Sequence, residues 1–326
     1  MFIKNIIITN FRNFNLLEVK FDKINIIKGK NGTGKTNLIE AVYLTLNGHP
    51  FKNNLKVLKK ELEKPTILNA IIDKHTIFIK IDDDKKYIKL DSKLVRVVDL
   101  KKTFACLNYS INSFISFRSK DYLFSLVDRG ISSYDHSIID KLIEYKKTNR
   151  LKKELFSSPK PDYNMLNFLN DKIKSIVDEI SLKRDGFILK LKNDVENCFC
   201  SFFGKKLELI YEIGKYNDSV FEKEKQKNRV LFGFKKDSLK IILNNKDLFL
   251  YSSVGEKKIS LLCIVLSIAK MYNSSGVEPI LLIDDLEGDL DPQVQKRAFD
   301  IIKTLPNQSI ITTLGAYTDH NIITLE

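Results

Sequence analysis

The sequence lacks a long apolar segment, and it lacks the features of a secretion signal. Its longest nearly apolar run covers residues 261–269, well short of the roughly 20 residues with which a helix crosses a bilayer. The amino terminus, Met1-Phe2-Ile3-Lys4, begins directly in a strand-like pattern, without the basic segment and apolar stretch of a signal peptide. We therefore expect a cytoplasmic protein that does not associate with a membrane.

Cysteine is also scarce, and its spacing argues against a metal centre. The four cysteines form no CxxC pair and are accompanied by no histidine cluster; they are Cys106, Cys198, Cys200 and Cys263. We expect reduced thiols, most of them buried. Internal repeats and low-complexity tracts are absent too. With 43% hydrophobic residues over 326 positions, the chain can form a folded core, and its length suits about two domains.

Arginine is rare, although the chain is strongly basic. Lysine and arginine together number 54, only eight of them arginine, and the formal net charge is +13. A cationic surface favours nucleic acid because binding releases counterions from the phosphates. A lysine-rich composition can equally reflect an AT-rich genome or the surface of a thermophilic protein. Charge alone therefore leaves nucleic-acid binding open.

Among the features that are present, one segment is the most informative. Gly29-Lys30-Asn31-Gly32-Thr33-Gly34-Lys35-Thr36 has the spacing of a phosphate-binding P-loop. A predicted strand at 24–28 precedes it and a predicted helix at 37–46 follows it, which is the context that a P-loop requires. A chance match in a lysine- and asparagine-rich chain is the alternative, but it does not account for these flanks.

The residue types of this loop suit a nucleoside triphosphate such as ATP. Glycines let backbone N–H groups turn toward an anion, and the amino terminus of the helix adds positive potential. Lys35 would reach the β- and γ-phosphates and take part in catalysis, and the Thr36 hydroxyl would coordinate Mg²⁺.

The first hundred residues have the composition of β-structure interrupted by the helix at 37–46. Strands are predicted at 2–8 and 16–21 around the turn-like Asn10-Phe11-Arg12-Asn13. Three further strands, at 67–72, 76–81 and 87–90, are predicted to form an antiparallel meander.

The middle of the chain is helical. Apolar residues recur at helical spacing over 137–155 and again from about Asp162, with the proline-containing stretch 157–161 between the two helices. This pattern predicts an antiparallel helix pair. Residues 145–153 are basic around most of the helix, which fits either a solvated face or a DNA contact.

The last third alternates strands and helices. The pattern predicts a hairpin at 239–243 and 248–251, helices at 256–272 and 292–304, and strands at 279–284 and 309–313. Such alternation is typical of parallel-sheet units. Since the P-loop and this segment must share one sheet, we predict an α/β head at 1–108 and 229–326, with a helical arm inserted at 109–228.

A P-loop needs an acidic partner for its metal, and residues 280–283 predict a buried strand that ends in two carboxylates. Asp284 would hold Mg²⁺ at the carboxyl end of the strand, as Walker B residues do. Asp285 would polarise the attacking water as a general base. A strand that merely ends in a polar turn is the alternative, which the P-loop in the same chain disfavours.

Two further segments narrow the class. Ser253-Val254-Gly255-Glu256 precedes a long apolar helix and resembles the signature motif of ATP-binding cassette heads, in which Ser253 and Gly255 would bind the nucleotide of another subunit. An ordinary helix N-cap is the alternative for this short motif. Glu287-Gly288-Asp289-Leu290-Asp291 resembles the D-loop of the same class, in which two heads enclose two nucleotides.

Over nearly its whole length, the chain resembles the RecF family of bacterial recombination mediators, which are related to the SMC ATPase heads. The resemblance lies in Asn10-Phe11-Arg12-Asn13, in the P-loop and its helix through Ala41, in 48–51, in 142–155, and in 282–286 with Asp289-Leu290-Asp291. Thr312 and Thr313 stand where cassette transporters carry a histidine switch and RecF-like proteins carry threonines.

Three segments depart from the family pattern. Asp135-His136 stand where the family carries an arginine pair, Gly233-Phe234-Lys235-Lys236-Asp237-Ser238 replaces Gly-Pro-His-Arg-Asp-Asp, and Val254-Gly255-Glu256 replaces the Gln-Gly-Gln of the signature. These differences concern nucleotide sensing and the rate of hydrolysis, and they leave the P-loop and the metal carboxylate intact.

The resemblance implies an ABC/SMC-like ATPase head whose ATP-dependent dimer binds DNA at gaps or single-strand/double-strand junctions. It implies slow, DNA-stimulated hydrolysis and partnership with RecR and RecO in loading RecA during repair and at stalled replication. The implied DNA contacts are Lys146, Lys147, Arg150, Lys152 and Lys153. Arg12 would touch a nucleotide phosphate, with a structural arginine at a turn as the alternative, and Asp121 would sense the γ-phosphate.

Two other classes share this fold. The nucleotide-binding subunit of an ABC transporter would need a transmembrane partner and a histidine switch, and it would lack the helical insertion. A non-hydrolysing, degenerate DNA-clamp head is compatible with the altered signature.

Overall fold

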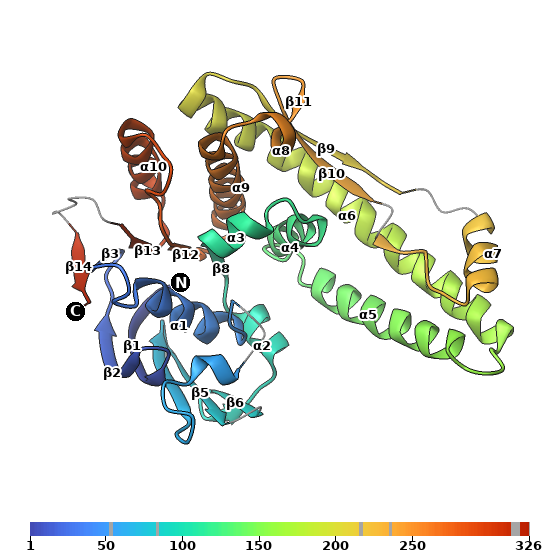
Figure 1. Cartoon of the computed structure of the whole chain (residues 1–326), viewed down its shortest axis with the longest axis horizontal. Helices are drawn as coiled ribbons and strands as arrows, with labels where there is room; N and C mark the ends of the chain where they lie inside the picture. The colour runs from blue at the N-terminus through green and yellow to red at the C-terminus, as the bar shows by residue number, and fades with distance from the viewer. Residues whose placement is uncertain (52–54, 83–84, 215–217, 235–236, 314–319, 326) are drawn as a thin grey trace. The chain divides into compact units, whose positions relative to one another are not determined.

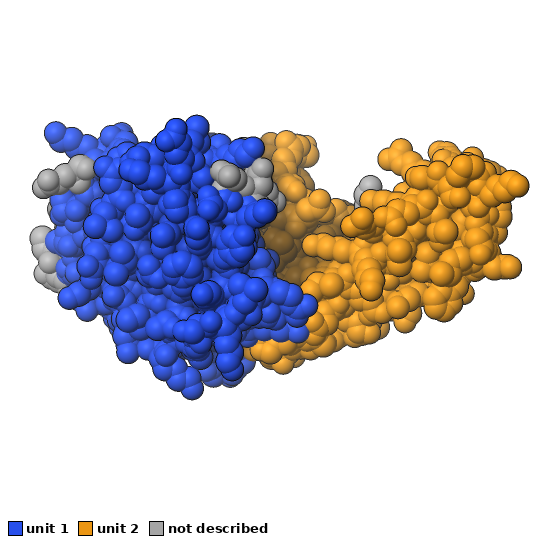
Figure 2. Space-filling view, turned by 90° about the horizontal axis from the view of Figure 1, so that it is seen from below, with its two compact units in different colours: residues 1–116, 254–326 blue, residues 117–253 orange. Residues whose placement is uncertain are grey.

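The computed structural model describes residues 1–51, 55–82, 85–214, 218–234, 237–313 and 320–325. The chain forms two compact units, Met1–Ser116 with Val254–Glu326, and Phe117–Ser253. Figure 2 colours the first unit blue and the second orange. The second unit therefore interrupts the first in the sequence, as an inserted arm would.

An antiparallel sheet of the first unit has the strand order β2-β1-β4-β5-β6-β7. Its strands are β1 Ile3–Phe11, β2 Phe14–Lys20, β4 Thr66–Ile72, β5 His75–Asp82, β6 Lys85–Leu90 and β7 Lys93–Leu94. Alternate residues of β5, such as Ile77, Ile79 and Ile81, are buried, as expected for a sheet with one face toward a core. The predicted antiparallel meander is confirmed.

A second sheet is parallel throughout and has the order β14-β3-β13-β12-β8. Its strands are β3 Ile24–Lys28, β8 Cys106–Tyr109, β12 Ile280–Ile283, β13 Ser309–Thr312 and β14 Asn321–Thr324. Every residue of β12 and β13 is buried, because both faces of a parallel sheet are covered. The strand before the P-loop and the strands near the carboxyl terminus do share one sheet, as predicted.

Helix α1, Lys35–Asn47, packs between the two sheets of the first unit. It contacts β1, β4 and β5 of the antiparallel sheet and β8, β12 and β13 of the parallel sheet. Residues 38–47 are therefore buried on all sides of the helix, and not only on the apolar side that the sequence predicts. The other helices of this unit are η1 Lys56–Leu58, α2 Val97–Thr103, α3 Ile111–Ser116, α9 Val254–Ser274 and α10 Pro292–Thr304.

The second unit is built on the 41-residue helix α6, Tyr163–Phe203, which spans about 60 Å at 1.5 Å per residue. Helix α5, Ser137–Phe156, packs along α6 in the antiparallel direction, as predicted (Figure 1). The ion pair of Lys141 with Glu179 joins the two helices. The remaining elements are α4 Lys120–Ile131, α7 Asp218–Lys227, α8 Leu248–Tyr251, β9 Leu207–Glu212, β10 Ser238–Leu243 and β11 Lys246–Asp247.

Two predictions for residues 229–253 are wrong. The sequence predicts a strand at 248–251, but these residues form the short helix α8, because the Asp247 carboxylate accepts the N–H groups of Phe249 and Leu250. The strand β10 pairs with β11 and with β9, and β9 follows α6. This sheet therefore belongs to the second unit, which covers 117–253 and not 109–228.

The sequence predicts that no helix crosses a membrane and that most of the thiols are buried. Within the described ranges, no helix combines the length and the apolar character needed to cross a bilayer. Cys106 and Cys263 are buried, Cys198 is half-buried and Cys200 is exposed. Burial therefore holds for two of the four cysteines.

The basic stretch of α5 is less uniform than the sequence predicts. Lys152 is fully buried, and its ammonium donates to Glu224 Oε2 at 2.6 Å and to Asn170 Oδ1 at 2.9 Å. Glu224, also fully buried, accepts the N–H groups of Leu231 and Phe232 through its other oxygen. The prediction that Lys152 contacts DNA is therefore wrong, because its ammonium is buried and paired inside the unit.

This buried pair makes a prediction about stability. The Lys152→Met variant leaves the Glu224 carboxylate buried without its cation, so we expect a loss of about 3 to 5 kcal/mol in the free energy of unfolding. Urea denaturation followed by circular dichroism measures the loss.

The neighbouring Lys153, which is exposed, is the matched control, and Lys153→Met should change stability by less than about 0.5 kcal/mol. Adding Glu224→Gln to Lys152→Met should recover part of the loss, because a neutral amide oxygen can still accept the two backbone N–H groups. Equal stability of the two single methionine variants would contradict the assignment.

Candidate functional site

The predicted P-loop connects β3 to α1, and its backbone needs glycine at two positions. Gly32 and Gly34 have φ angles of +89° and +105°, in the region that side chains rarely adopt. At Gly34 an added Cβ would also lie 2.6 Å from Asn13 Nδ2 and 2.8 Å from Phe14 Cζ. Gly34 is the N-cap of α1, so the loop delivers the chain directly to a helix amino terminus.

The Lys35 ammonium folds back over the loop that precedes it. Its Nζ donates to the carbonyl oxygens of Gly29 at 2.6 Å and Lys30 at 3.0 Å. The loop is closed by Thr33, whose N–H and hydroxyl both donate to the Lys30 carbonyl. The cationic group is thus held at the loop itself, where it can exchange carbonyl partners for phosphate oxygens.

The Asp284 carboxylate joins the two halves of the predicted site. Its Oδ1 accepts the Thr36 hydroxyl at 3.2 Å and the Thr312 hydroxyl at 2.7 Å. The residue is only 3% exposed, and its buried Oδ2 has no hydrogen-bond partner among the residues that the structure describes. A hydrogen bond therefore links the P-loop directly to the predicted Walker B carboxylate.

Burial raises the pKa of the Asp284 carboxyl above its ordinary value of 3.8, while hydrogen bonds from Thr312 and Thr36 act in the opposite direction. A buried carboxylate oxygen without a partner is costly unless a cation or donor satisfies it. Together with the adjacent Thr36 hydroxyl, it supplies the oxygen ligands that Mg²⁺ prefers. The residues present thus fit the metal that the sequence predicts.

Asp285 follows at the edge of the parallel sheet and differs from Asp284 in its surroundings. It is exposed and has a φ angle of +58°. Its backbone N–H donates to the Thr312 hydroxyl at 2.8 Å, so one threonine fixes both carboxylate residues. An exposed carboxylate beside a buried one suits the two different roles predicted for the pair.

The residues that line the small hollow around these carboxylates include several that sequence reasoning missed. They are Tyr109, Ser110, Ile111, Phe114 and Lys258, together with Asp284 and Asp285. Tyr109 and Ser110 follow from topology, because β8 pairs with β12 in parallel and the carboxyl ends of both strands meet at one edge. Burial raises the pKa of the Tyr109 hydroxyl. Nothing in the local sequence marks these positions.

The turn between β1 and β2 supports the P-loop. Asn13 Nδ2 donates to the Thr33 carbonyl at 2.8 Å, and Asn13 Oδ1 accepts from Asn37 Nδ2 at 2.8 Å. The family resemblance included this asparagine without giving it a role. Its amide clamps the loop to the first turn of α1.

Arg12 lies beside that turn, but its guanidinium is already engaged. Nε and Nη2 bind Glu40 Oε2 at 2.9 and 2.8 Å, and Nη1 donates to the Val57 carbonyl at 2.9 Å. Glu40 is nearly fully buried on α1. The contacts are those of a structural arginine at a turn, the alternative that the sequence left open.

The predicted signature residues stand at the start of α9. Ser253 immediately precedes this helix and Gly255 lies in its first turn. The space beside Gly255 is bounded by the D-loop, since an added Cβ would lie 3.5 Å from the Asp289 carbonyl oxygen and from Leu290 Cδ2. Gly255 of the predicted signature is thus placed next to the D-loop.

The D-loop itself connects the two carboxylates to α10. The Thr313 hydroxyl donates to Glu287 Oε1, and Asp291 is the N-cap of α10, its carboxylate accepting the N–H of Gln293. Asp121, predicted to sense the γ-phosphate, lies in the second unit, where it is exposed in the first turn of α4. Two of the departing residues, Lys235 and Lys236, lie outside the described residues.

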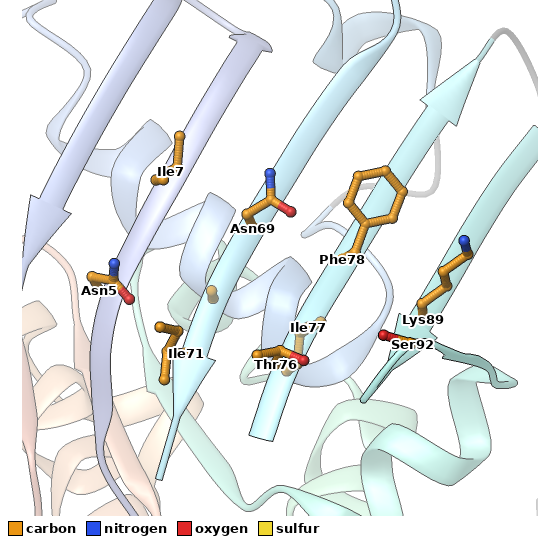
Figure 3. Close-up of a pocket in the computed structure, with 10 residues that line it drawn as sticks. Asn5, Ile7, Asn69, Ile71, Thr76, Ile77, Phe78, Lys89 and Ser92 are labelled. Carbon is orange, nitrogen blue, oxygen red and sulfur yellow. The ribbon is translucent and has the colours of Figure 1, made fainter. Parts of the chain in front are cut away.

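A larger hollow, of about 420 Å³, lies on the face of the antiparallel sheet that points away from the core, and it contains none of the predicted site residues. Figure 3 shows Asn5, Asn69, Phe78 and Lys89 standing on neighbouring strands of this face. Among the described residues that line it, Lys89 is the one ionisable side chain. The chemistry for nucleotide binding therefore gathers at the edge of the parallel sheet and not in this larger hollow.

Known proteins resemble this chain over nearly its full length. Two of them, from Caldanaerobacter subterraneus subsp. tengcongensis and Carboxydothermus hydrogenoformans, are each named DNA replication and repair protein RecF. Each is 27% identical to this chain, and each match covers 96% of this chain and 94% of the relative.

Solved structures share the fold. The recombination mediator protein RecF with ATP, from the RecFOR pathway, matches with a TM-score of 0.85 at 23% identity, covering 99% of this chain and 95% of that one. An Smc head domain from Pyrococcus furiosus matches with a TM-score of 0.59 at 17% identity, covering 96% and 90%.

A model of the family described as "RecF/RecN/SMC N terminal domain" matches residues 2–322. The match includes every residue of the predicted P-loop, the two carboxylates and the signature. The chain belongs to the RecF/RecN/SMC N-terminal domain family.

Proposed function

We propose that this chain is an ATP-dependent DNA-binding protein of replication and repair, of the RecF type. The observation that carries the proposal is the meeting of Thr36 and Thr312 at the buried Asp284 carboxylate, one oxygen of which has no partner in the described part of the chain. Such an arrangement gives a triphosphate and its metal a common site. The names of the similar proteins supply the biological setting.

The residues divide the work of ATP hydrolysis as follows. The loop Gly29 to Thr36 cradles the phosphates with its backbone N–H groups, and Lys35 contributes a charge toward the β- and γ-phosphates. Thr36 and Asp284 would hold Mg²⁺, which neutralises charge on the phosphate oxygens when bound. Asp285 accepts a proton from the attacking water, since it is the exposed carboxylate of the pair.

ATP binding would also make the protein a dimer. In this proposal, Ser253 and the amide of Gly255 at the start of α9 bind the γ-phosphate of a nucleotide held by the P-loop of a second copy. Nucleotide then lies between two heads, so its binding energy becomes association energy. Hydrolysis releases the dimer, and ATP acts as a switch.

The DNA-binding role rests on the similar proteins together with the charge of the chain. Of the five contacts predicted on the arm, four are exposed: Lys146, Lys147, Arg150 and Lys153. Arg150 also donates to Glu154 on the same helix, an exposed pair of small energetic weight. We infer that DNA gaps or single-strand/double-strand junctions bind this surface, with RecR and RecO as partners in loading RecA.

Two alternatives remain distinct from this proposal. A non-hydrolysing clamp would bind ATP and DNA without turnover. An ABC-transporter subunit is disfavoured because a threonine, Thr312, occupies the switch position and donates to Asp284, and because a helical unit interrupts the head.

The Lys35→Ala variant tests the phosphate cradle. We expect loss of ATP-dependent dimerisation, because a principal charge for the γ-phosphate is removed; light scattering with and without MgATP measures the mass. Lys23, exposed ahead of β3, is the matched control, and Lys23→Ala should dimerise normally. A Lys35→Ala protein that still doubles its mass with ATP would refute the cradle.

The Asp285→Asn variant tests hydrolysis. It should bind ATP as the unaltered protein does but turn it over about 100-fold more slowly, because the proton acceptor is lost. Turnover is measured with and without gapped duplex DNA. DNA-stimulated turnover in the unaltered protein supports the proposal, complete absence of turnover supports the non-hydrolysing clamp, and normal turnover in Asp285→Asn would place the base elsewhere.

The Asp284→Asn variant tests the metal site through stability. The pKa of Asp284 is higher in the folded protein than its ordinary value of 3.8, so ionisation of this carboxyl disfavours folding. The loss in the free energy of unfolding develops as the pH rises from the ordinary pKa through the raised pKa of the folded protein. The neutral amide should therefore raise the Tm of the nucleotide-free protein at pH 7 by about 1 to 3 °C. The gain should shrink as the pH is lowered toward 4.

MgATP should then act in the opposite sense. At about 100 times its Kd it should stabilise the unaltered protein by about 2.7 kcal/mol, and it should stabilise Asp284→Asn much less. A variant that is both less stable without nucleotide and fully stabilised by MgATP would contradict the assignment of this carboxylate.

A further inference from the structure

Lys258, in the second turn of α9, is a buried lysine that has no role in the proposed binding of ATP. The residue is 4% exposed, and its Nζ donates to the Gly288 carbonyl oxygen at 2.7 Å and to Asp289 Oδ2 at 2.9 Å. The ammonium also lies 5.6 Å from the centre of the Phe114 ring, within the range of a cation–π contact. A buried charge of this kind requires such partners, and here two of them belong to the D-loop.

The D-loop is fitted closely around this ammonium. An added Cβ on Gly288 would lie 2.6 Å from Asp285 Oδ2 and 2.9 Å from Lys258 Nζ. The proposed base and the lysine therefore both lie where a side chain on Gly288 would project, and a side chain at this position would displace one of them. Lys258 and Asp285 line the same small hollow.

The conformation of the loop needs such support. Asp285 and Asp289 both have left-handed φ angles, +58° and +59°, which cost energy in residues other than glycine. Their carboxylates, with those of Asp284 and Glu287, place four acidic groups within residues 284–289. The Lys258 ammonium offsets part of this repulsion and fixes the Gly288 carbonyl at the same time.

The same helix carries the signature at its start. Gly255 and Lys258 are three residues apart on α9, so they lie on one side of the helix, and Gly255 packs against Asp289 and Leu290 of the D-loop. A small shift at the start of α9 therefore moves the D-loop through two contacts, one of them charged.

We propose that Lys258 is a positioning residue that transmits the engagement of the signature to Asp285 through the D-loop. The inference rests on the proposed ATP-dependent dimer. When a nucleotide of the second copy binds at the start of α9, the contacts of Lys258 make Gly288 and Asp289 move together with the helix. The Asp285 carboxylate is thereby held in place for the attacking water.

The test compares Lys258→Met, which keeps the length of the side chain and removes its charge, with Lys258→Arg, which keeps a charge. Lys59→Met is the matched control, because Lys59 is also a buried lysine of the first unit that donates to a backbone carbonyl, that of Leu62. Three quantities are measured: the affinity for a fluorescent ATP analogue, turnover at saturating ATP, and amide hydrogen exchange of residues 286–290 without nucleotide.

We expect Lys258→Met to bind the analogue with an unchanged Kd, to lose turnover by about tenfold or more, and to exchange the amides of residues 286–290 faster. Lys258→Arg should recover part of the turnover, and Lys59→Met should change none of the three quantities. A purely structural role would instead lower nucleotide affinity and turnover together.

The proposal is overturned if Lys258→Met turns over ATP at the normal rate, if it loses affinity in parallel with turnover, or if Lys59→Met shows the same pattern. Failure of the ATPase function itself would be seen separately, as an absence of turnover in the unaltered protein. In that case the exchange rates at 286–290 still decide whether Lys258 holds the D-loop.

Discussion

The Asp284 carboxylate is the group on which the arrangement of the site depends. Thr36 lies 248 residues before it in the sequence and Thr312 lies 28 residues after it, yet both hydroxyls donate to the same oxygen. The contact is made because β3, β13 and β12 are neighbours in one parallel sheet, so their carboxyl ends open onto a common edge. The carboxylate is buried, and within the described ranges one of its oxygens has no hydrogen-bond partner, which disfavours the nucleotide-free protein and favours a bound cation. The folded protein is thus less stable because of the same carboxylate that would bind the cation.

The rest of the head holds this edge in place. Helix α1 lies between two sheets and is buried on all sides after its first turn, so the P-loop is anchored to the most enclosed helix of the unit. Asn13 clamps the loop from the antiparallel sheet, and Arg12 fixes the same turn through Glu40. The turn between β1 and β2 of the antiparallel sheet thus helps to set the position of the loop. Lys258 does the equivalent for the D-loop from α9.

Local motifs and periodicity were sufficient for the P-loop, the strand before Asp284, the meander and the helix pair, because each rests on contacts close in sequence. The predictions failed where a single contact, or a contact between residues far apart in the sequence, determines the structure. Residues 248–251 are a short apolar run that suits strand or helix, and the Asp247 cap makes it a helix. Lys152 looked like one more surface lysine, but its partner Glu224 lies 72 residues away. The role of Lys258 was equally hidden, since its partners come from a loop 30 residues further on.

We propose that one MgATP binds between the glycine loop and the Asp284 carboxylate. A crystal structure with a slowly hydrolysed ATP analogue and Mg²⁺ tests it most directly. We expect phosphate density over the backbone N–H groups of residues 32–36, with Lys35 Nζ turned from the Gly29 carbonyl to a phosphate oxygen. A metal should lie next to Thr36 Oγ1 on the side of Asp284. Nucleotide bound anywhere else, or a Lys35 side chain that keeps its carbonyl partners in the complex, would contradict it.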